Sequence, residues 1–140
     1  MAATLTASNF GALPVRKLET GLFAHYFHWE SNGTSMSAGD VFLMGYIPAN
    51  TTVIDAYMYG GGCELETYRV GNQASTTAIA GTTTLAATLV RLPVTPRTFS
   101  LSADAEGLHR IPITMTKVAG TSTATGSLNL ILILSADPII

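Results

Sequence analysis

The chain has 140 residues, a net charge of −2, 11% charged residues and 47% hydrophobic ones. This length fits one domain with its own hydrophobic core, and the lack of a basic excess argues against a nucleic-acid-binding protein. Soluble domains carry about 25% charged residues, so a surface this poor in charge predicts a protein that works within an assembly.

Residues 1–18 mix small and apolar residues with a few polar ones, and they show no hydrophobic period. They contain no basic segment followed by an apolar run, so they do not read as a signal peptide. We predict an extended N-terminal arm, either free or docked on a neighbouring protein, followed by one domain over residues 19–140. The single cysteine excludes an intrachain disulfide and fits a chain made in a reducing compartment.

The segment 21–30 is dense in aromatic residues, which favour β-strands. Neighbouring side chains of a strand point to opposite faces, so His25 and His28 are expected on opposite sides of a sheet. Metal ligands must converge on one ion. We therefore expect no metal site at these two histidines and interpret both as half-buried, hydrogen-bonded imidazoles.

Two pairs of apolar runs are predicted to form β-hairpins. In the first, Asp40–Ile47 and Thr52–Tyr59 flank the turn Pro48–Thr51, and Pro48 ends its strand because it cannot donate a ladder hydrogen bond. In the second, IPITMTKV and SLNLILILS flank the loop AGTSTATG within Ile111–Ser135.

The last of these strands is apolar on both faces. Alternation places four leucines on one side and Asn129, Ile131 and Ile133 on the other. A strand with water on one side would alternate apolar with polar residues, so both faces of this strand are expected to be covered. One cover is the core, and in a chain this short the second is expected to be another copy of the chain. The apolar run is far shorter than the about 20 residues of a membrane helix.

Between the two predicted hairpins, short strand-like runs alternate with loops. Gly60–Gly62 is interpreted as a bulge or corner, because the strand-like CELETYRVG follows it instead of the helix that a phosphate-binding loop needs. Residues 72–84 read as a loop with room for a helical turn, and Leu85–Leu92 fits a strand better than a helix. About eight short strands without a firm helix predict an all-β fold, a β-sandwich or jelly roll.

No part of the sequence forms a convincing active site, so we expect no enzyme activity and no cofactor. Cys63 and His109 leave a nucleophile–base pair open, although buried inert thiols are far commoner. Glu64 and Glu66 share a strand face, about 7 Å apart. Such acid pairs occur in glycosidases, but a solvated face or an ion pair with Arg69 is the preferred interpretation here.

The order of these segments resembles a broad group of small structural proteins encoded by tailed bacteriophages. The resemblance runs from VFLMGYIPANTTVIDAYMY through TYRVGN to ITMTKVAGTSTATGSLNLILIL and spans about residues 40–135. Members of the group are capsid decoration or cement proteins, which are β-sandwich or jelly-roll modules, often trimeric, on the outer capsid lattice. This sequence departs from their commoner pattern in having fewer acidic residues and the aromatic strand Phe23–Trp29.

The resemblance implies a non-enzymatic virion protein that binds the capsid surface as a homo-oligomer, a trimer, and stabilises it. It implies as partners the major capsid protein lattice and other copies of the chain, but neither nucleic acid nor membrane, with assembly in the host cytoplasm. The predicted oligomer-interface residues are Phe42, Met44, Tyr46, Asn129, Ile131 and Ile133. The predicted capsid contacts, all in the arm, are Phe10, Leu13, Val15, Arg16 and Lys17.

Two other classes of function stay open. A tail- or fibre-associated module that binds a host glycan or receptor would stack sugar rings on the aromatic stretch His25–Trp29 and on Tyr57 and Tyr59. A small jelly-roll enzyme would need His and Glu clustered on inward-facing strands, and the sequence offers too few at suitable spacing. Fold alone does not decide between these functions.

Overall fold

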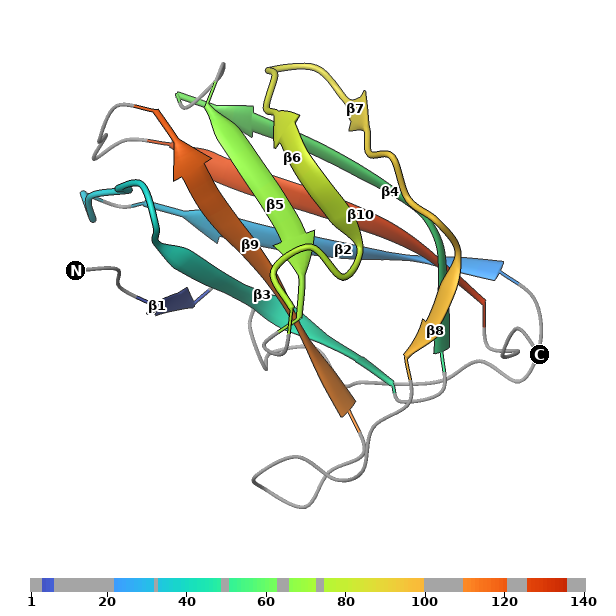
Figure 1. The fold of residues 1–140 in the computed structure, drawn as a ribbon. Coiled ribbons are helices and arrows are strands. Elements are labelled where there is room, and N and C mark those ends of the chain that lie inside the picture. Colours follow the sequence, from blue (N-terminus) through green and yellow to red (C-terminus); the bar gives the residue numbers. More distant parts are fainter. Residues whose placement is uncertain are drawn as a thin grey trace.

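The computed structural model describes residues 4–6, 22–31, 33–48, 51–62, 66–72, 75–99, 110–120 and 126–135, and these form an all-β sandwich. Two five-stranded sheets pack face to face (Figure 1). The first has the order β1 (Thr4–Thr6), β3 (Val41–Pro48), β9 (Arg110–Ala119), β5 (Thr67–Gly71) and β6 (Ala80–Thr84). The second has the order β2 (Leu22–Glu30), β10 (Ser127–Ser135), β4 (Thr51–Gly61) and β7 (Val90–Arg91), with β8 (Arg97–Phe99) also paired to β4.

The strand pairs form one antiparallel ribbon in which the chain folds back along itself. β2 pairs with β10, β3 with β9, β4 with β7 and β8, and β5 with β6. Successive pairs of this ribbon alternate between the two sheets, and the pairs β10–β4 and β9–β5 complete each sheet. This winding is that of a jelly roll. The predicted fold class is therefore confirmed.

Both predicted hairpins are wrong in their pairing, although their segments are strands as predicted. β3 and β4 belong to different sheets, and so do β9 and β10. A turn between two apolar runs reverses the chain whether the second run lies beside the first or on the opposite layer of a sandwich. Here each turn leads across the core, because both strands of each predicted hairpin pair with strands that are distant in sequence.

The middle of the chain differs from its prediction in two places. Ala80–Thr84, interpreted as part of a loop, forms the edge strand β6. Within Leu85–Leu92 only Val90–Arg91 is a strand. Leu85 follows β6 directly, and its side chain is buried in the core. Its N–H donates a hydrogen bond to the Glu66 carbonyl at 2.8 Å. A chain rich in Thr, Ala and Gly has a weak period, so its strand boundaries were not visible in the sequence.

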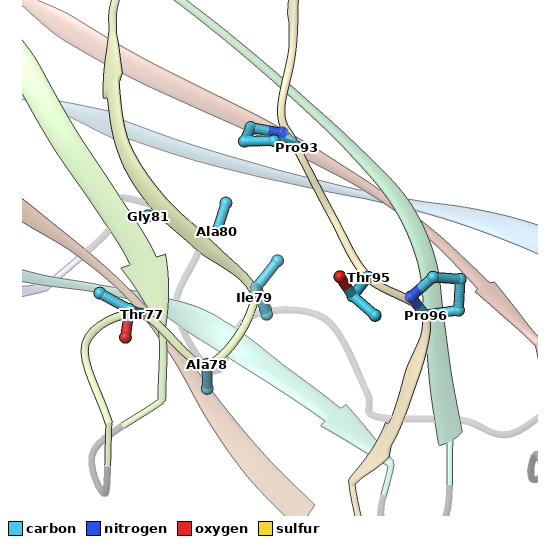
Figure 2. Close-up of a pocket in the computed structure, with 8 residues that line it drawn as sticks. All are labelled: Thr77, Ala78, Ile79, Ala80, Gly81, Pro93, Thr95 and Pro96. Atoms are coloured by element: carbon cyan, nitrogen blue, oxygen red, sulfur yellow. The ribbon is translucent and has the colours of Figure 1, made fainter.

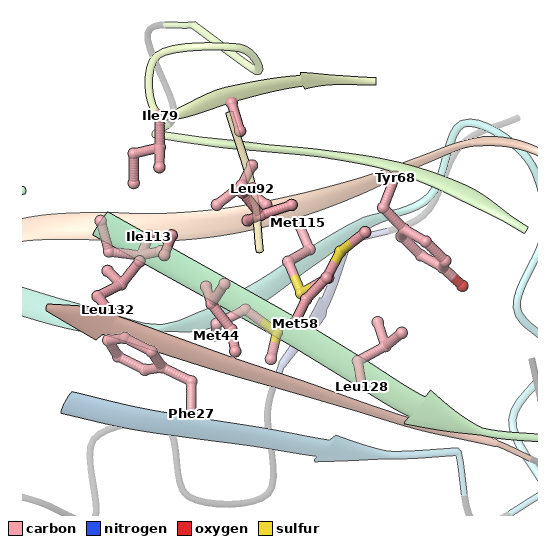
Figure 3. Close-up of a cluster of buried hydrophobic side chains, with 14 of the residues drawn as sticks. Phe27, Met44, Met58, Tyr68, Ile79, Leu92, Ile113, Met115, Leu128 and Leu132 are labelled. Carbon is pink, nitrogen blue, oxygen red and sulfur yellow. The ribbon is translucent and has the colours of Figure 1, made fainter. Parts of the chain in front are cut away.

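The core fills the space between the two sheets. The Phe42 ring lies edge-on to the Trp29 ring, and their centroids are 4.7 Å apart. The centroid of the Tyr68 ring lies 6.3 Å from that of Phe42. β3 approaches β2 so closely that a side-chain carbon added at Gly45 would lie 2.6 Å from the Phe27 ring. Figure 3 shows side chains from both sheets meeting in this layer, among them Phe27, Met44, Met58, Ile113, Met115, Leu128 and Leu132.

Strand β9 also carries two hydroxyl groups that the fold leaves unsatisfied. Ile111, Ile113 and Met115 point into the core, and the residues between them point outward. The Oγ1 atoms of Thr114 and Thr116, on the outward side, are nevertheless buried and have no hydrogen-bond partner. A buried hydroxyl without a partner costs free energy in the folded state.

Thr114→Val is therefore expected to raise the free energy of unfolding by about 1 kcal/mol, because the substitution keeps the shape and removes the unsatisfied hydroxyl. Urea denaturation followed by circular dichroism measures this difference. The matched control is Thr82→Val, which should be destabilising or neutral because Thr82 Oγ1 accepts a hydrogen bond from Arg69 Nε at 3.1 Å. A loss of stability in Thr114→Val would contradict the assignment.

Candidate functional site

The described residues offer no metal centre: none of their His, Cys, Asp and Glu side chains form a group of three or more placed to hold an ion. As predicted, His25 and His28 lie on opposite faces of β2. His25 stacks on Phe27 with ring centroids 4.6 Å apart, and burial lowers the pKa of His25. The other residues considered for catalysis lie outside the described part of the chain: Cys63, Glu64 and His109.

A buried ion pair joins β9 to the start of β5. Lys117, which is 0% exposed, places Nζ 3.0 Å from Glu66 Oε2 and donates to the Met36 carbonyl at 3.0 Å. Tyr68 donates its hydroxyl to the same Glu66 oxygen at 3.2 Å. Glu66 is thus neither on a solvated face nor paired with Arg69, which corrects the interpretation from the sequence. With these partners inside the sandwich, the pair serves the structure and offers no accessible acid or base.

One open pocket, of about 370 Å³, lies between the start of β6 and the segment that links β7 to β8 (Figure 2). Ala80 and Ile79 are buried at its inner side, and Pro93 and Pro96 stand opposite. None of its lining residues is titratable, so the lining offers no general acid or base and nothing to activate the hydroxyls of Thr77 and Thr95 as nucleophiles. The lining consists of Thr77, Ala78, Ile79, Ala80, Gly81, Pro93, Thr95 and Pro96.

The outer side of the sheet formed by β2, β10, β4 and β7 carries aromatic and polar side chains side by side on neighbouring strands. Cross-strand register places Ile131 between Tyr26 and Tyr57, and Asn129 between His28 and Tyr59. We call this surface the tyrosine face. Its members are Ala24, Tyr26, His28, Glu30, Asp55, Tyr57, Tyr59, Arg91, Asn129, Ile131 and Ile133.

Asn129 organises one half of the tyrosine face. Its Oδ1 accepts hydrogen bonds from the Tyr26 hydroxyl at 2.5 Å and from His28 Nδ1 at 2.6 Å, and its Nδ2 donates to the Tyr59 carbonyl at 3.3 Å. The second ring nitrogen of His28, Nε2, lies 3.1 Å from Glu30 Oε1. These bonds hold side chains of β2 and β10 against the backbone of β4, so this half of the face is preorganised.

Asp55 organises the other half. Its carboxylate accepts hydrogen bonds from Arg91 Nε at 3.1 and 3.2 Å, from the Tyr57 hydroxyl at 3.0 Å and from the Ala56 N–H at 2.9 Å. Desolvation alone would raise the pKa of Asp55, but the hydrogen bonds from these three donors outweigh it and lower that pKa. The charges of this corner are therefore balanced within one protomer.

Tyr26 is expected to ionise unusually late. Partial burial first, then a hydrogen bond with Tyr59 and the nearby Tyr59 and Glu30 charges, raise the pKa of Tyr26 to about 12. Because the folded state holds this proton more tightly than the unfolded state, the stabilisation is complete below pH about 10 and is lost as the pH rises toward 12. The hydrogen bond to Asp55 also raises the pKa of Tyr57, so alkaline titration should show late phenolate absorbance that Tyr26→Phe reduces and Tyr46→Phe retains. Loss of the late step in Tyr46→Phe instead would contradict the assignment.

The predicted interface residues divide between the core and the surface. Phe42 and Met44 are 0% exposed and pack in the core, so they are unavailable to a second copy. Their strand is bulged at Leu43–Gly45, and both of its faces are apolar, so alternation alone could not show which face points inward. Tyr46 is half-buried on the outer side of β3, under the Arg110 guanidinium at 3.7 Å.

The other three predicted interface residues lie together on the tyrosine face. Ile131 and Ile133 are half-buried there, and Asn129 is 4% exposed with its amide used within the protomer. Reasoning from the sequence missed Tyr26, Tyr59 and Arg91 as their neighbours, because register across three strands is needed to find them. The five predicted capsid contacts all lie outside the described residues: Phe10, Leu13, Val15, Arg16 and Lys17.

No protein-family model and no curated protein sequence matches the chain. Among solved structures, a chain in the capsid of Ralstonia phage GP4 is similar with a TM-score of 0.71 and 17% identity, over 98% of this chain and 99% of that one. A chain in the capsid asymmetric unit of cyanophage Pam1 is similar with a TM-score of 0.52 and 14% identity, over 88% of this chain and 90% of that one. At such identities the likeness establishes a shared fold. None of the described residues forms a helix long and apolar enough to cross a membrane.

Proposed function

We propose that the chain is a non-enzymatic structural protein of a phage virion, a decoration or cement protein that binds the outer capsid lattice as a homo-oligomer. The observation that carries the proposal is the overlap with a chain of the Ralstonia phage GP4 capsid, which is nearly complete in both chains. The matched chain is therefore also one sandwich of about this size. The low charge of the present chain, 11% of its residues, fits a protein held within such an assembly.

Cementing of this kind needs no chemistry. A protein that binds the intact lattice and not its separated subunits stabilises the lattice by mass action. Repetition of one site over many lattice positions adds avidity when the bound protein is an oligomer. An all-β domain with hydrogen-bonded side chains on an outer face is consistent with this role.

We place the self-association surface on the tyrosine face. Specific interfaces have an apolar centre with a polar rim and are enriched in Tyr and Arg. Ile131 and Ile133 form such a centre, with Tyr26 and Tyr57 beside them and Arg91 at the edge. Symmetric closure is the usual form of homo-oligomers, and we propose a trimer.

Ile131→Lys is expected to weaken self-association more than about tenfold, because it places an ammonium group at the apolar centre of the interface. Sedimentation velocity and light scattering measure the mass. The matched control is Val118→Lys, which changes a half-buried residue on the outer side of the other sheet and should leave the mass unchanged. If Val118→Lys lowered the oligomer mass and Ile131→Lys did not, the interface would lie on the other sheet. If the wild-type protein were a monomer at micromolar concentration, the proposed homo-oligomer would be wrong.

The capsid role is tested by adding purified protein to preformed empty shells of the phage. We expect saturable binding and a higher melting temperature of the shell by calorimetry, with a smaller increase for Ile131→Lys because avidity is lost. Absence of binding by the intact oligomer would overturn the decoration role, whatever the oligomer's structure.

The alternative function, binding of a glycan, cannot use Trp29, the largest aromatic side chain of the stretch His25–Trp29. Trp29 is 3% exposed and packs on Phe42 in the core, so it cannot stack on a sugar. Tyr57 and Tyr59 do lie on an outer face, and a glycan array on the wild-type protein tests this remaining version.

A further inference from the structure

Strand β6 forms an open edge of its sheet. It pairs with β5 on one side, and no described strand pairs with it on the other. The Leu85 N–H donates to the Glu66 carbonyl on the β5 side. Because inward and outward main-chain groups alternate along an edge strand, the N–H and C=O groups of Thr82 and Thr84 point to the open side. Proline and charged residues often protect such edges, but β6 has neither, and its Gly81, Thr82 and Thr84 are exposed.

The segment that faces β6 from the other sheet is closed to strand pairing. The Leu92 N–H donates to the Ala56 carbonyl of β4 at 2.9 Å, and the Val94 N–H donates to the Leu92 carbonyl at 2.9 Å. Pro93 and Pro96 have no N–H to donate. This segment cannot form a regular ladder, so a strand added on this side of the sandwich would pair with β6.

The pocket of about 370 Å³ lies directly beside this open edge, between β6 and the segment with the two prolines (Figure 2). Ile79 and Ala80 form its inner side and are 4% and 2% exposed. The lining carries no charged residue, and a charged side chain entering it would lose hydration without gaining an opposite charge. The pocket therefore favours small apolar side chains. Gly81 lies at its border, where an added side-chain carbon would meet no atom within 4 Å.

We infer that β6 is a capsid-binding edge: an extended, uncharged segment of the capsid subunit adds to it as a further strand, and alternate side chains of that segment enter the pocket. In such strand addition, main-chain hydrogen bonds give affinity and pockets for alternate side chains give specificity. The inference rests on the proposed function and names the surface that binds the lattice. The occupant is the capsid subunit and not a second copy, because the proposed self-association uses the tyrosine face on the other sheet and leaves the β6 edge open.

Two variants of the full-length protein test the edge and the pocket separately. Thr84→Pro removes an outward N–H, which an edge strand tolerates because it does not contribute to the ladder with β5. Gly81→Glu places a carboxylate at the border of the pocket and leaves every main-chain hydrogen bond of β6 in place, so it tests the site even where Thr84→Pro lowers stability. We expect each change to weaken binding to preformed empty shells more than about tenfold, measured by co-sedimentation, with the oligomer mass unchanged.

The matched controls are Thr84→Val, which keeps the N–H, and Gly81→Ala, which adds no charge; both should bind shells like the wild-type protein. Unchanged binding by Thr84→Pro and Gly81→Glu would overturn the inference and leave the decoration role standing. A lower oligomer mass in these two variants would assign the edge to a second copy and would also overturn the inference. If the wild-type protein did not bind shells, the decoration role and the capsid-binding edge would both be wrong.

Discussion

Phe42→Ala is expected to lower the free energy of unfolding by about 3–5 kcal/mol, the range for deleting a buried aromatic ring. The ring is 0% exposed, lies edge-on to Trp29 and is close to Tyr68, so its removal leaves a cavity bordered by both sheets. These neighbours are themselves held by their strands and cannot fill the space. Chemical denaturation of the purified variant measures the loss, and we expect much of the variant to be unfolded at physiological temperature.

The matched control for Phe42→Ala is Tyr46→Ala on the same strand. Tyr46 is half-buried on the outer side, where it contacts Arg110, so its truncation should cost clearly less stability. This comparison separates a core role for Phe42 from an interface role. If Phe42→Ala kept wild-type stability and instead lost oligomer mass, the position would act between copies, as the sequence alone suggested.

Lys117→Ala is expected to cost about 3–5 kcal/mol, because it leaves the Glu66 carboxylate buried without its cation. The Lys117 ammonium is fully buried, and it also satisfies the Met36 carbonyl. Removing it therefore leaves two acceptors with a lost partner. The effect should appear in equilibrium denaturation at neutral pH, without any change in the tyrosine face.

A double-mutant cycle distinguishes this ion pair from a simple packing effect. Lys117→Met with Glu66→Gln removes both charges while largely keeping volume, and the combination should cost less than the sum of the two single changes. Strictly additive losses would mean that the two side chains do not interact energetically. Arg91→Met, at an exposed pair with Asp55, is the surface control and should cost clearly less stability than either single change at the buried pair.

The sequence allowed the strands to be predicted because alternation of apolar residues is a local property. It also allowed the layer architecture to be predicted, since about eight short strands without a helix have few ways to bury their inner faces. Pairing was predicted wrongly for β3–β4 and for β9–β10, because partners in a jelly roll are distant in sequence. A local turn signal reports only that the chain reverses.

The buried ion pair did leave a signal in the sequence that was overlooked. Lys117 shares its parity with Ile111, Ile113 and Met115, so the alternation of β9 points it inward. A lysine on the core side of a strand requires a buried acid, and Glu66 shares the parity of Tyr68 and Val70 in the same way. Which acid it meets could not be inferred, because that depends on the register of β5 against β9.

Of the candidate interaction surface, the sequence indicated only the central strand. Asn129, Ile131 and Ile133 follow from alternation within β10 alone. Their neighbours, such as Tyr26 and Arg91, come from strands roughly 100 and 40 residues earlier in the chain, and local rules cannot set such register. The trimeric state and the capsid contacts of the arm stay predictions.

The position of β10 has a consequence for biosynthesis. This strand, the last described, lies between β2 and β4, so the sheet has no centre until Ser127–Ser135 has been made. Pairings this distant in sequence are also slow to form. While β10 is still missing, the core-facing side chains of β2 and β4 lack the strand that joins them and stay exposed, so we expect the folding chain to depend on chaperones.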